Sequence, residues 1–387
     1  MKRNMSVENA KFSFTIVDTE QGLKEVLPVL KQSSILSVDL EADSMFNFRE
    51  KVCLIQLAVP GLNLVVDPLK VSNLELLKPL FSNKHTQKVL HGADYDIRSL
   101  YRDFGFEINN LFDTELACRF LGIHETGLDA VLTDRFGIHL DKRFQRKDWS
   151  NRPLSPEMVE YAARDVIHLH ALSELLHDEL KQKGRYEWVM EECRILSRVR
   201  PPLTSHEPLF IRFKGAGRLD RRSLSVLEEL LQLRTRLAEK KNRPVFKIMS
   251  SGSLLRLCTE KPESIGKLQK MDVVSPRQAS MYGESIIDAI RQGMAVPEKD
   301  LPKYPRKRIP MPEPEIPERV KAIKEWRDQL AAEIQIDPAM LFNKALMTAI
   351  AAKKPENLKS LGEVDGIRNW QKKEFGKEII KILRQQK

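Results

Sequence analysis

Two acidic residues stand two positions apart at the end of an apolar stretch near the start of the chain. Residues 35–39 read as a buried strand, and Asp39 and Glu41 point to the same face of that strand. Two carboxylates held side by side repel each other and are costly to desolvate, so they favour a hard divalent cation such as Mg²⁺ between them. The chain has 54 acidic residues, and chance alone gives about seven such acid-x-acid triplets. The pair therefore indicates a metal site only if further acids join it.

A second acidic motif follows a short strand predicted over residues 87–91. A turn of small residues comes next, and Asp94 and Asp96 then open a helix predicted over 97–104. In open α/β sheets, binding and catalytic sites lie beyond the carboxyl ends of the strands, so these acids stand in a position typical of such a site. Aspartate is also common at any helix N-terminus, so the residues by themselves leave both Asp94 and Asp96 as candidates.

A third motif places Tyr161 and Asp165 four residues apart on a helix that begins at Pro156. Residues four apart share one helical face, and this face continues with Leu169 and Leu172 toward the core. A carboxylate on an otherwise buried face needs a partner, which favours a site over a solvated ion pair.

The elements around these motifs predict a mixed α/β sheet. Strands at 35–39, 52–59 and 64–67 are separated by short turns and predict an antiparallel meander. Short strands and helices then alternate, which predicts a mixed sheet with helices on both faces. This order is that of the ribonuclease-H-like fold. The remaining predicted elements are a strand at 12–17, helices at 19–31 and 74–81, a strand at 111–113 and a helix at 114–122.

Composition bounds the class of protein. A chain of 387 residues predicts two or three domains, and 42% hydrophobic with 30% charged residues fits a globular protein. The net charge of +10 favours an anionic partner, nucleic acid first, although a basic protein can also be merely well solvated. The four cysteines form no CxxC pair, which argues against a zinc knuckle or a disulfide framework. No signal peptide or membrane span is expected, so we expect a cytoplasmic protein with no membrane partner.

The three acidic motifs together resemble those of the DEDD 3′–5′ exonucleases of the tyrosine subtype, and closely those of the ribonuclease D group. The resemblance covers the first 200 residues. It is carried by Val38-Asp39-Leu40-Glu41, His91-Gly92-Ala93-Asp94-Tyr95-Asp96, Leu111-Phe112-Asp113-Thr114, residues 147–155 and Tyr161-Ala162-Ala163-Arg164-Asp165.

The resemblance implies two-metal hydrolysis with two divalent cations, Mg²⁺ or Mn²⁺. Carried over residue by residue, the metal ligands are Asp39, Glu41, Asp96 and Asp165, and the family tyrosine is Tyr161. Asp39 would bridge the two ions, and Tyr161 would orient the attacking water. The product would be a nucleoside 5′-monophosphate from the 3′ end.

Several other residues are candidates for contact with the substrate. Met45 and Phe46 could stack on the terminal nucleotide, or could simply pack the rim of the site. The basic loop 142–147, with Arg143, Arg146 and Lys147, could follow the phosphates of the incoming strand, or could be an ordinary solvated loop. His91 belongs to the family motif and joins these candidates without an assigned chemical role.

The second half of the chain contains an internal repeat at a constant offset of about 93 residues. Lys261-Pro262-Glu263 recurs as Lys354-Pro355-Glu356, and no gap is needed to align the two copies. Each copy predicts only helices; in the first these are 224–241, 252–259, 265–270 and 278–293. The first copy resembles the helicase-and-RNase-D C-terminal (HRDC) domain, a nucleic-acid-binding module, and the second resembles it more weakly.

These observations predict an exonuclease domain at 1–205, HRDC domains at 206–296 and 315–387, and a stiff proline-rich linker at 297–314. The basic run 303–308 in that linker could bind phosphate or merely keep the linker solvated. The predicted function is a 3′-to-5′ exoribonuclease that trims tRNA precursors and other structured RNAs, as a monomer. The alternatives are a DNA exonuclease of the same family and a non-catalytic RNA-binding processing factor.

Overall fold

The computed structural model of the protein describes residues 13–202, 207–305 and 315–385. Two compact units divide the chain, and each is contiguous in space but not in sequence. Of the described residues, the first unit contains 13–42, 52–201 and 315–385, and the second contains 43–51, 202 and 207–305. Within the described residues no helix is long and apolar enough to cross a membrane.

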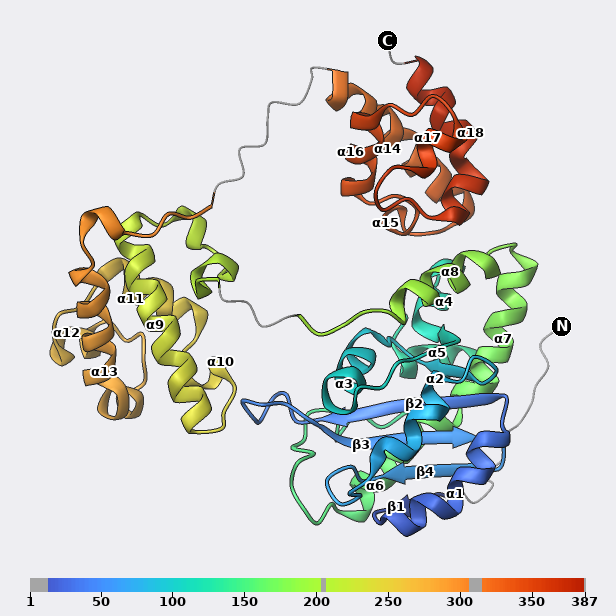
Figure 1. Cartoon of the computed structure of the whole chain (residues 1–387), viewed down its shortest axis with the longest axis horizontal. Coiled ribbons are helices and arrows are strands. Elements are labelled where there is room, and N and C mark those ends of the chain that lie inside the picture. Colours follow the sequence, from blue (N-terminus) through green and yellow to red (C-terminus); the bar gives the residue numbers. More distant parts are fainter. Residues whose placement is uncertain (1–12, 203–206, 306–314, 386–387) are drawn as a thin grey trace. The chain divides into compact units, whose positions relative to one another are not determined.

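A six-stranded mixed sheet forms the centre of the exonuclease domain, with strand order β1-β4-β3-β2-β5-β6 (Figure 1). The long strands β2, β3 and β4 are antiparallel neighbours, as the sequence predicts. The other pairings are parallel: β1 with β4, β5 with β2, and β6 with β5. Every residue of β3 is buried, so this strand crosses the middle of the domain. The strands are β1 Thr15–Val17, β2 Ile35–Ala42, β3 Val52–Val59, β4 Leu62–Val66, β5 Gln87–Leu90 and β6 Leu111–Asp113.

Helices flank this sheet, and two of them differ from the prediction. The predicted helix 97–104 begins earlier, at Asp94, so Asp96 lies inside the first turn and Ala93 is the N-cap. The predicted helix 74–81 starts as a 3₁₀ turn. The helices are α1 Glu20–Gln32, α2 Lys78–Ser82, α3 Asp94–Phe104, α4 Thr114–Leu121, α5 Leu128–Phe136, α6 Pro156–Ile167, α7 Leu169–Gln182 and α8 Tyr186–Leu196.

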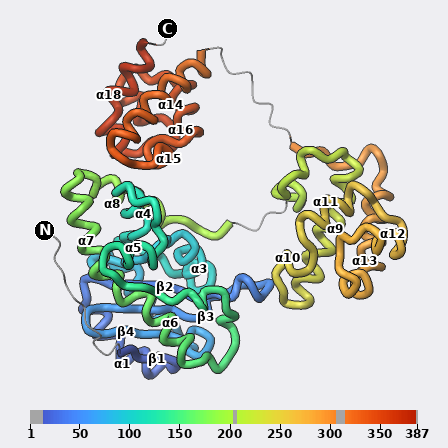
Figure 2. Tube along the Cα trace, turned by 180° about the vertical axis from the view of Figure 1, so that it is seen from behind, coloured from blue at the N-terminus to red at the C-terminus, as the bar shows by residue number. Residues whose placement is uncertain are grey.

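The two copies of the repeat fold as small all-helical bundles, which confirms the predicted helical class (Figure 2). The first copy consists of α9 Arg221–Lys240, α10 Val245–Ile248, α11 Ser251–Glu260, α12 Ile265–Lys270 and α13 Pro276–Ala295. The second consists of α14 Glu315–Ile334, α15 Pro338–Leu341, α16 Lys344–Lys353, α17 Leu358–Gly362 and α18 Asn369–Gln385. Part of the predicted linker and of its basic run, residues 306–314, lies outside the described residues; 3₁₀ turn η4, Glu298–Asp300, precedes it.

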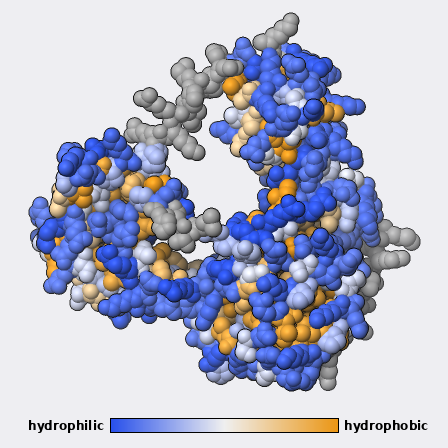
Figure 3. Space-filling view, in the orientation of Figure 1, coloured by the Kyte–Doolittle hydropathy of each residue, from blue (hydrophilic) through white to orange (hydrophobic). Residues whose placement is uncertain are grey.

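Apolar side chains form one core shared by the exonuclease domain and the second helical copy, and a separate core inside the first copy. In the shared core Trp188 of α8 stacks on Trp370 of α18 with ring centroids 4.7 Å apart. A smaller cluster joins α6 to β3 and β4 through Cys53, Val65 and Val159. Hydrophilic residues make up most of the surface visible in Figure 3.

Candidate active site

Strand β2 carries the first two acids of the site on one face. Asp39 lies opposite Gln56 of β3 and Glu41 lies opposite Leu54, and the register of the pairing shifts just after Glu41. Because successive side chains alternate between faces, residues 39 and 41 project to the same side of the sheet. The register shift ends the regular ladder where the acids lie, as bulges near active sites often do.

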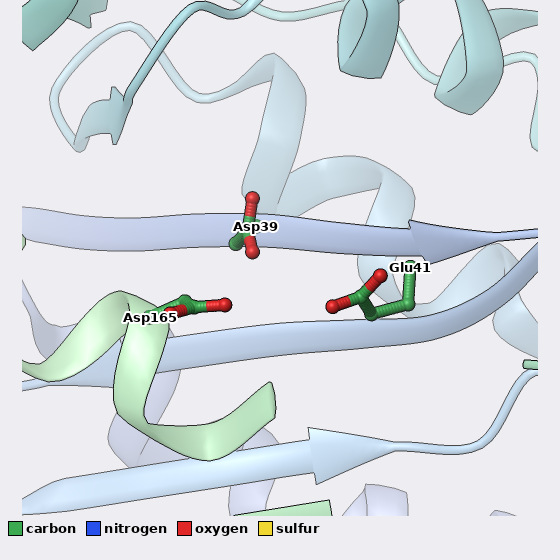
Figure 4. A group of neighbouring side chains, drawn as sticks. All are labelled: Asp39, Glu41 and Asp165. Atoms are coloured by element: carbon green, nitrogen blue, oxygen red, sulfur yellow. The ribbon is translucent and has the colours of Figure 1, made fainter. Parts of the chain in front are cut away.

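Helix α6 brings Asp165 to the same place (Figure 4). Ligand-type oxygen atoms of Asp39, Glu41 and Asp165 all lie within 4.8 Å of one another. The three carboxylates come from β2 and α6 and point toward a common space. Among the residues that the structure describes, this is the one group of three or more such side chains close enough to share a metal ion.

The loop before α6 is fixed to the sheet by Arg152. Its guanidinium binds the buried carboxylate of Asp67 through two contacts, of 2.7 and 2.8 Å. It also donates to the carbonyl oxygens of Trp149, at 2.7 Å, and Cys53, at 2.9 Å. Ser155 then caps α6 by accepting from the backbone N–H of Met158. These contacts set the position at which the helix, and with it Asp165, meets the sheet.

The fourth acid, Asp96, is buried in the first turn of α3. The turn before it is held by Asp113 of β6, which accepts the backbone N–H groups of Gly92, at 3.0 Å, and Ala93, at 2.8 Å. Gly92 has a positive φ of 72°, and a Cβ atom there would lie 2.7 Å from the Glu115 carboxylate. The turn therefore requires glycine.

Asp94, the competing candidate, occupies a different environment. Its carboxylate pairs with Arg98 at 2.7 Å and its side chain is 56% exposed. Asp96, in contrast, is 8% exposed, and its pKa is raised first by burial and then by the charge of Asp39. The burial of Asp96 and the exposure of Asp94 favour Asp96 as the fourth acid, and its role as a metal ligand stays a prediction.

Burial and mutual repulsion act together on the four carboxyl groups. Desolvation raises the pKa of Asp39 to about 6, and desolvation followed by the charge of Asp39 raises that of Asp165 to about 8. The pKa values of Glu41 and Asp96 are raised well above their usual range, again chiefly by desolvation. A bound cation would remove this penalty, because it supplies the positive charge that the protein does not place there. The donor set, all carboxylate oxygen, suits Mg²⁺ or Mn²⁺.

Tyr161 lies on α6 one turn before Asp165. Its ring stacks on Trp149, with centroids 6.0 Å apart, and meets the edge of Phe144 at 5.8 Å. Burial first, and then the charges of Asp165, Glu41 and Asp39, raise the pKa of its hydroxyl. The hydroxyl therefore stays protonated and can donate or accept a hydrogen bond, but it cannot serve as a base.

A cavity of about 450 Å³ is lined in part by Asp39, Tyr161 and Asp165. His91, a predicted substrate contact, lines it, and His91 Nδ1 lies 2.9 Å from the hydroxyl of Thr114. Lys142 and Gln145, which belong to the predicted basic loop, also line the cavity. Asp113 caps α4 and holds the turn before α3, a role that the sequence motif alone did not indicate. Its position directly before a predicted helix is the feature from which the capping role could have been inferred.

The other predicted substrate contacts have varied surroundings. Arg143 binds Asp141 at 2.6 Å, and the neighbouring Lys142 binds Asp129 at 3.0 Å, so acids of the same region balance part of this loop's charge. Arg146 and Lys147 are exposed. Met45 and Phe46 belong to the second compact unit, where Met45 is 52% exposed and the ring of Phe46 lies 4.3 Å from the ammonium group of Lys247. Substrate contact at all five positions stays a prediction.

Comparison with known proteins supports the interpretation of both halves. The 3′–5′ exonuclease family matches residues 14–181, and the HRDC domain family matches residues 223–290 and 317–383. Ribonuclease D of Gluconacetobacter diazotrophicus is 28% identical over 371 residues, which are 95% of this chain and 92% of the relative. Ribonuclease D of Desulfotalea psychrophila is 27% identical over 377 residues, which are 95% of this chain and 98% of the relative.

Solved structures agree in fold. Escherichia coli RNase D, described as an exoribonuclease involved in structured RNA processing, has a TM-score of 0.74 at 22% identity and covers 97% of this chain and 99% of its own. The catalytic core of RRP6 from Trypanosoma brucei has a TM-score of 0.65 at 28% identity over 73% of this chain and 80% of its own. The chain thus has a 3′–5′ exonuclease domain followed by two HRDC domains, is similar to ribonuclease D over 95% of its length, and is a 3′–5′ exoribonuclease.

Proposed function

We propose that the protein trims the 3′ ends of tRNA precursors and other structured RNAs by two-metal hydrolysis at Asp39, Glu41, Asp96 and Asp165. The observation that carries this proposal is the convergence of three carboxylates from β2 and α6 within 4.8 Å of one another. Four acids with raised pKa values in one place are unfavourable for the fold unless they hold cations.

Each side chain has a distinct role in this proposal. Asp39 would hold both ions, Glu41 and Asp165 the ion beside the attacking water, and Asp96 the ion beside the leaving 3′ oxygen. Two bound divalent ions supply an activated water and neutralise charge on the phosphate during in-line displacement. The hydroxyl of Tyr161 orients the water by a hydrogen bond, since its raised pKa keeps the proton in place. The product is a nucleoside 5′-monophosphate.

Structured RNA is the substrate class that the domain arrangement favours. Relatives named ribonuclease D match the helical copies as well as the exonuclease domain, so the helical copies belong to the shared architecture. A single-stranded 3′ end suits a cavity of about 450 Å³, while a folded RNA body must remain outside it. We further propose that the enzyme acts in the cytoplasm and as a monomer, because one chain carries both the catalytic and the helical domains.

A matched pair of variants tests the site. Asp96→Asn removes the charge of the buried acid, and Asp94→Asn removes that of its exposed neighbour two residues earlier, which binds Arg98. The substrate is a tRNA precursor with a short 3′ tail and a 5′ label, incubated with Mg²⁺ or Mn²⁺. We expect stepwise shortening by the wild type and by Asp94→Asn. For Asp96→Asn we expect a rate lower by about 10³-fold, which corresponds to about 4 kcal/mol.

Three controls separate the alternatives. EDTA should stop the reaction, and isothermal titration of Mn²⁺ should show weaker binding to Asp96→Asn than to Asp94→Asn. Single-stranded DNA of the tail sequence distinguishes a DNA exonuclease, which would degrade it in preference to the RNA. A folded wild-type protein that shortens neither substrate with either metal would refute the catalytic proposal and leave an RNA-binding processing factor.

A further inference from the structure

The two helical copies can be compared residue by residue in the structure. Helix α11 and helix α16 differ by 93 positions at both ends, and α13 and α18 begin at residues 276 and 369, again 93 apart. Equivalent side chains make equivalent contacts. Arg234 donates to the carbonyl of Met249 in the first copy, and Arg327 donates to that of Phe342 in the second. Any face of one copy therefore has a defined counterpart on the other.

One face of the second copy contacts helix α8 of the same chain. It consists of the end of α14, helix α15 and the start of α18, and we call it the docking face. Trp370 is 3% exposed because it stacks on Trp188 of α8. Glu191 of α8 accepts the backbone N–H groups of Asn369, at 2.7 Å, and Trp370, at 2.9 Å, and so caps α18. Arg185 donates to the carbonyl of Ile334.

The same face of the first copy is a cationic hollow. It has a volume of about 470 Å³ and lies between the end of α9, helix α10 and the start of α13. We call it the α10 pocket, and no aspartate or glutamate lines it. Its lining residues are Lys241, Arg243, Lys247, Ile248, Arg277, Gln278, Met281 and Tyr282.

Each cation of the α10 pocket has an apolar residue at the counterpart position of the docking face. The uncharged positions are similar in the two copies: Tyr282 corresponds to another aromatic residue, Phe375, and Gln278 corresponds to Gln371. The two faces therefore share these residues and differ at the cationic positions. Gln278 donates to the backbone carbonyl of Ile248 in α10, and Gln371 donates to that of Leu341 in α15. Counting 93 positions forward, Lys241, Arg243, Lys247 and Arg277 correspond to Ile334, Ile336, Met340 and Trp370.

The four cations of the α10 pocket are exposed and lack the acidic partners that some other cations of this unit have. Within the described part of the chain none of them forms an ion pair, whereas Arg256 pairs with Glu260 and Lys267 pairs with Glu263. Two of them rest on aromatic rings. The ammonium group of Lys241 lies 5.5 Å from the ring of Tyr282, and that of Lys247 lies 4.3 Å from the ring of Phe46. Such contacts hold the side chains in place and leave their N–H groups free to bind oxygen.

From this contrast we propose that the α10 pocket binds backbone phosphates of the RNA substrate. The proposal rests on the exoribonuclease function proposed above, because RNA is then the polyanion that the protein meets. Several like charges in one hollow repel one another, and a phosphodiester chain neutralises them while releasing its counterions. Met281 is 45% exposed at the edge of the pocket and gives an apolar surface for a base or ribose next to the bound phosphates.

The test is RNA binding by the full chain in EDTA, so that catalysis plays no part. The double variant Arg243→Gln, Arg277→Gln removes two pocket charges. The control Arg256→Gln, Lys267→Gln removes two charges from the same unit that acids already balance and that lie outside the pocket. Binding of a fluorescent single-stranded RNA and of a 3′-tailed tRNA precursor is followed by anisotropy between 50 and 400 mM salt, after circular dichroism and melting have shown that both variants are folded.

The expected effect follows from counterion release. Each phosphate contact on a single strand contributes about 0.7 to the slope of log K against log salt, so losing two contacts lowers the slope by about 1.4 and weakens binding about 25-fold at 0.1 M salt. The control should change affinity by less than about threefold.

Equal losses in both variants would overturn the proposal, because the effect would then be one of net charge. An unchanged slope in the pocket variant would overturn it as well. Competition by poly-glutamate at lower charge concentration than RNA would assign the pocket to an acidic protein instead. A protein that binds RNA as expected but does not shorten it would refute the proposed function while supporting the pocket.

Discussion

Replacing Asp113 by asparagine tests how the acid of the second motif is held in place. One carboxylate oxygen of Asp113 accepts the backbone N–H groups of Gly92, Glu115 and Leu116, at 3.0, 2.9 and 3.1 Å. The other accepts the N–H of Ala93 at 2.8 Å. Asp113 is 2% exposed, so water cannot replace these bonds. A single side chain thus caps α4 and holds the turn that leads into α3.

The magnitude follows from the hydrogen bonds that asparagine can keep. Its carbonyl oxygen can still accept three N–H groups, but its amide NH₂ then faces the N–H of Ala93, which is a donor opposite a donor. One charge-assisted bond is lost, worth about 1.5–3 kcal/mol, and the three that remain become weaker because the acceptor is no longer ionised. We expect the exonuclease domain to lose about 3–5 kcal/mol of unfolding free energy. That loss lowers the melting temperature by roughly 6–20 °C.

The assay combines stability with metal binding. Urea unfolding and thermal melting compare Asp113→Asn with Asp134→Asn, which removes the same charge from a side chain that is 73% exposed on α5. Titration of Mn²⁺ at 20 °C, where both variants are folded, should show weaker binding only for Asp113→Asn, since Asp96 is displaced with the turn. Stability within 1 kcal/mol of wild type together with unchanged metal affinity would refute the idea that Asp113 positions this part of the site.

Three further predictions follow from the site. Arg152→Lys should lower stability by about 2–4 kcal/mol in urea unfolding, because lysine cannot bind Asp67 at two points and two carbonyls at once; an unchanged midpoint would contradict this. Tyr161→Phe should leave stability within about 1 kcal/mol, since the ring contacts remain, but lower kcat about 10²-fold. Because its pKa is raised, the tyrosine is protonated on both sides of neutrality, and kcat measurements should give the same loss at pH 7 and pH 9. Mn²⁺ at 100 times its Kd should stabilise the wild type by about 2.7 kcal/mol in calorimetry and leave Asp39→Asn nearly unchanged.

Much of the exonuclease domain could be predicted because its signals are local. The strand that ends at Asp39 is apolar and followed by acids, and the helix at Pro156 begins with a cap and a proline, so both appear in a short window of sequence. The start of α3 was predicted three residues late, because Asp94 and Tyr95 carry no apolar periodicity while their backbone is fixed by distant Asp113. The residue roles assigned from the family motifs, and the domain boundaries, stay predictions.

Contacts between distant segments could not be predicted. Lys142 and Arg143 read as free positive charges in the sequence, yet Asp129 and Asp141 bind them in the structure, and only the fold brings Asp129 to that loop. The repeat indicated two equal helical copies, but it gave no sign that the second would share a core with the exonuclease domain. That association depends on Trp188, which lies outside the repeat, so comparison of the copies alone could not show it.

The shared core also has a consequence for the protein during its synthesis. Trp188 and Trp370 are 182 residues apart in the chain. At roughly 5–20 residues per second, α8 waits roughly 9–36 s on the ribosome before its partner helix exists. Through this interval a nascent exonuclease domain presents the face of Trp188 to water and to other nascent chains. Glu191 and Glu192 bind α18 in the folded protein, and we expect their charge to keep the unpaired surface hydrated and to discourage premature association.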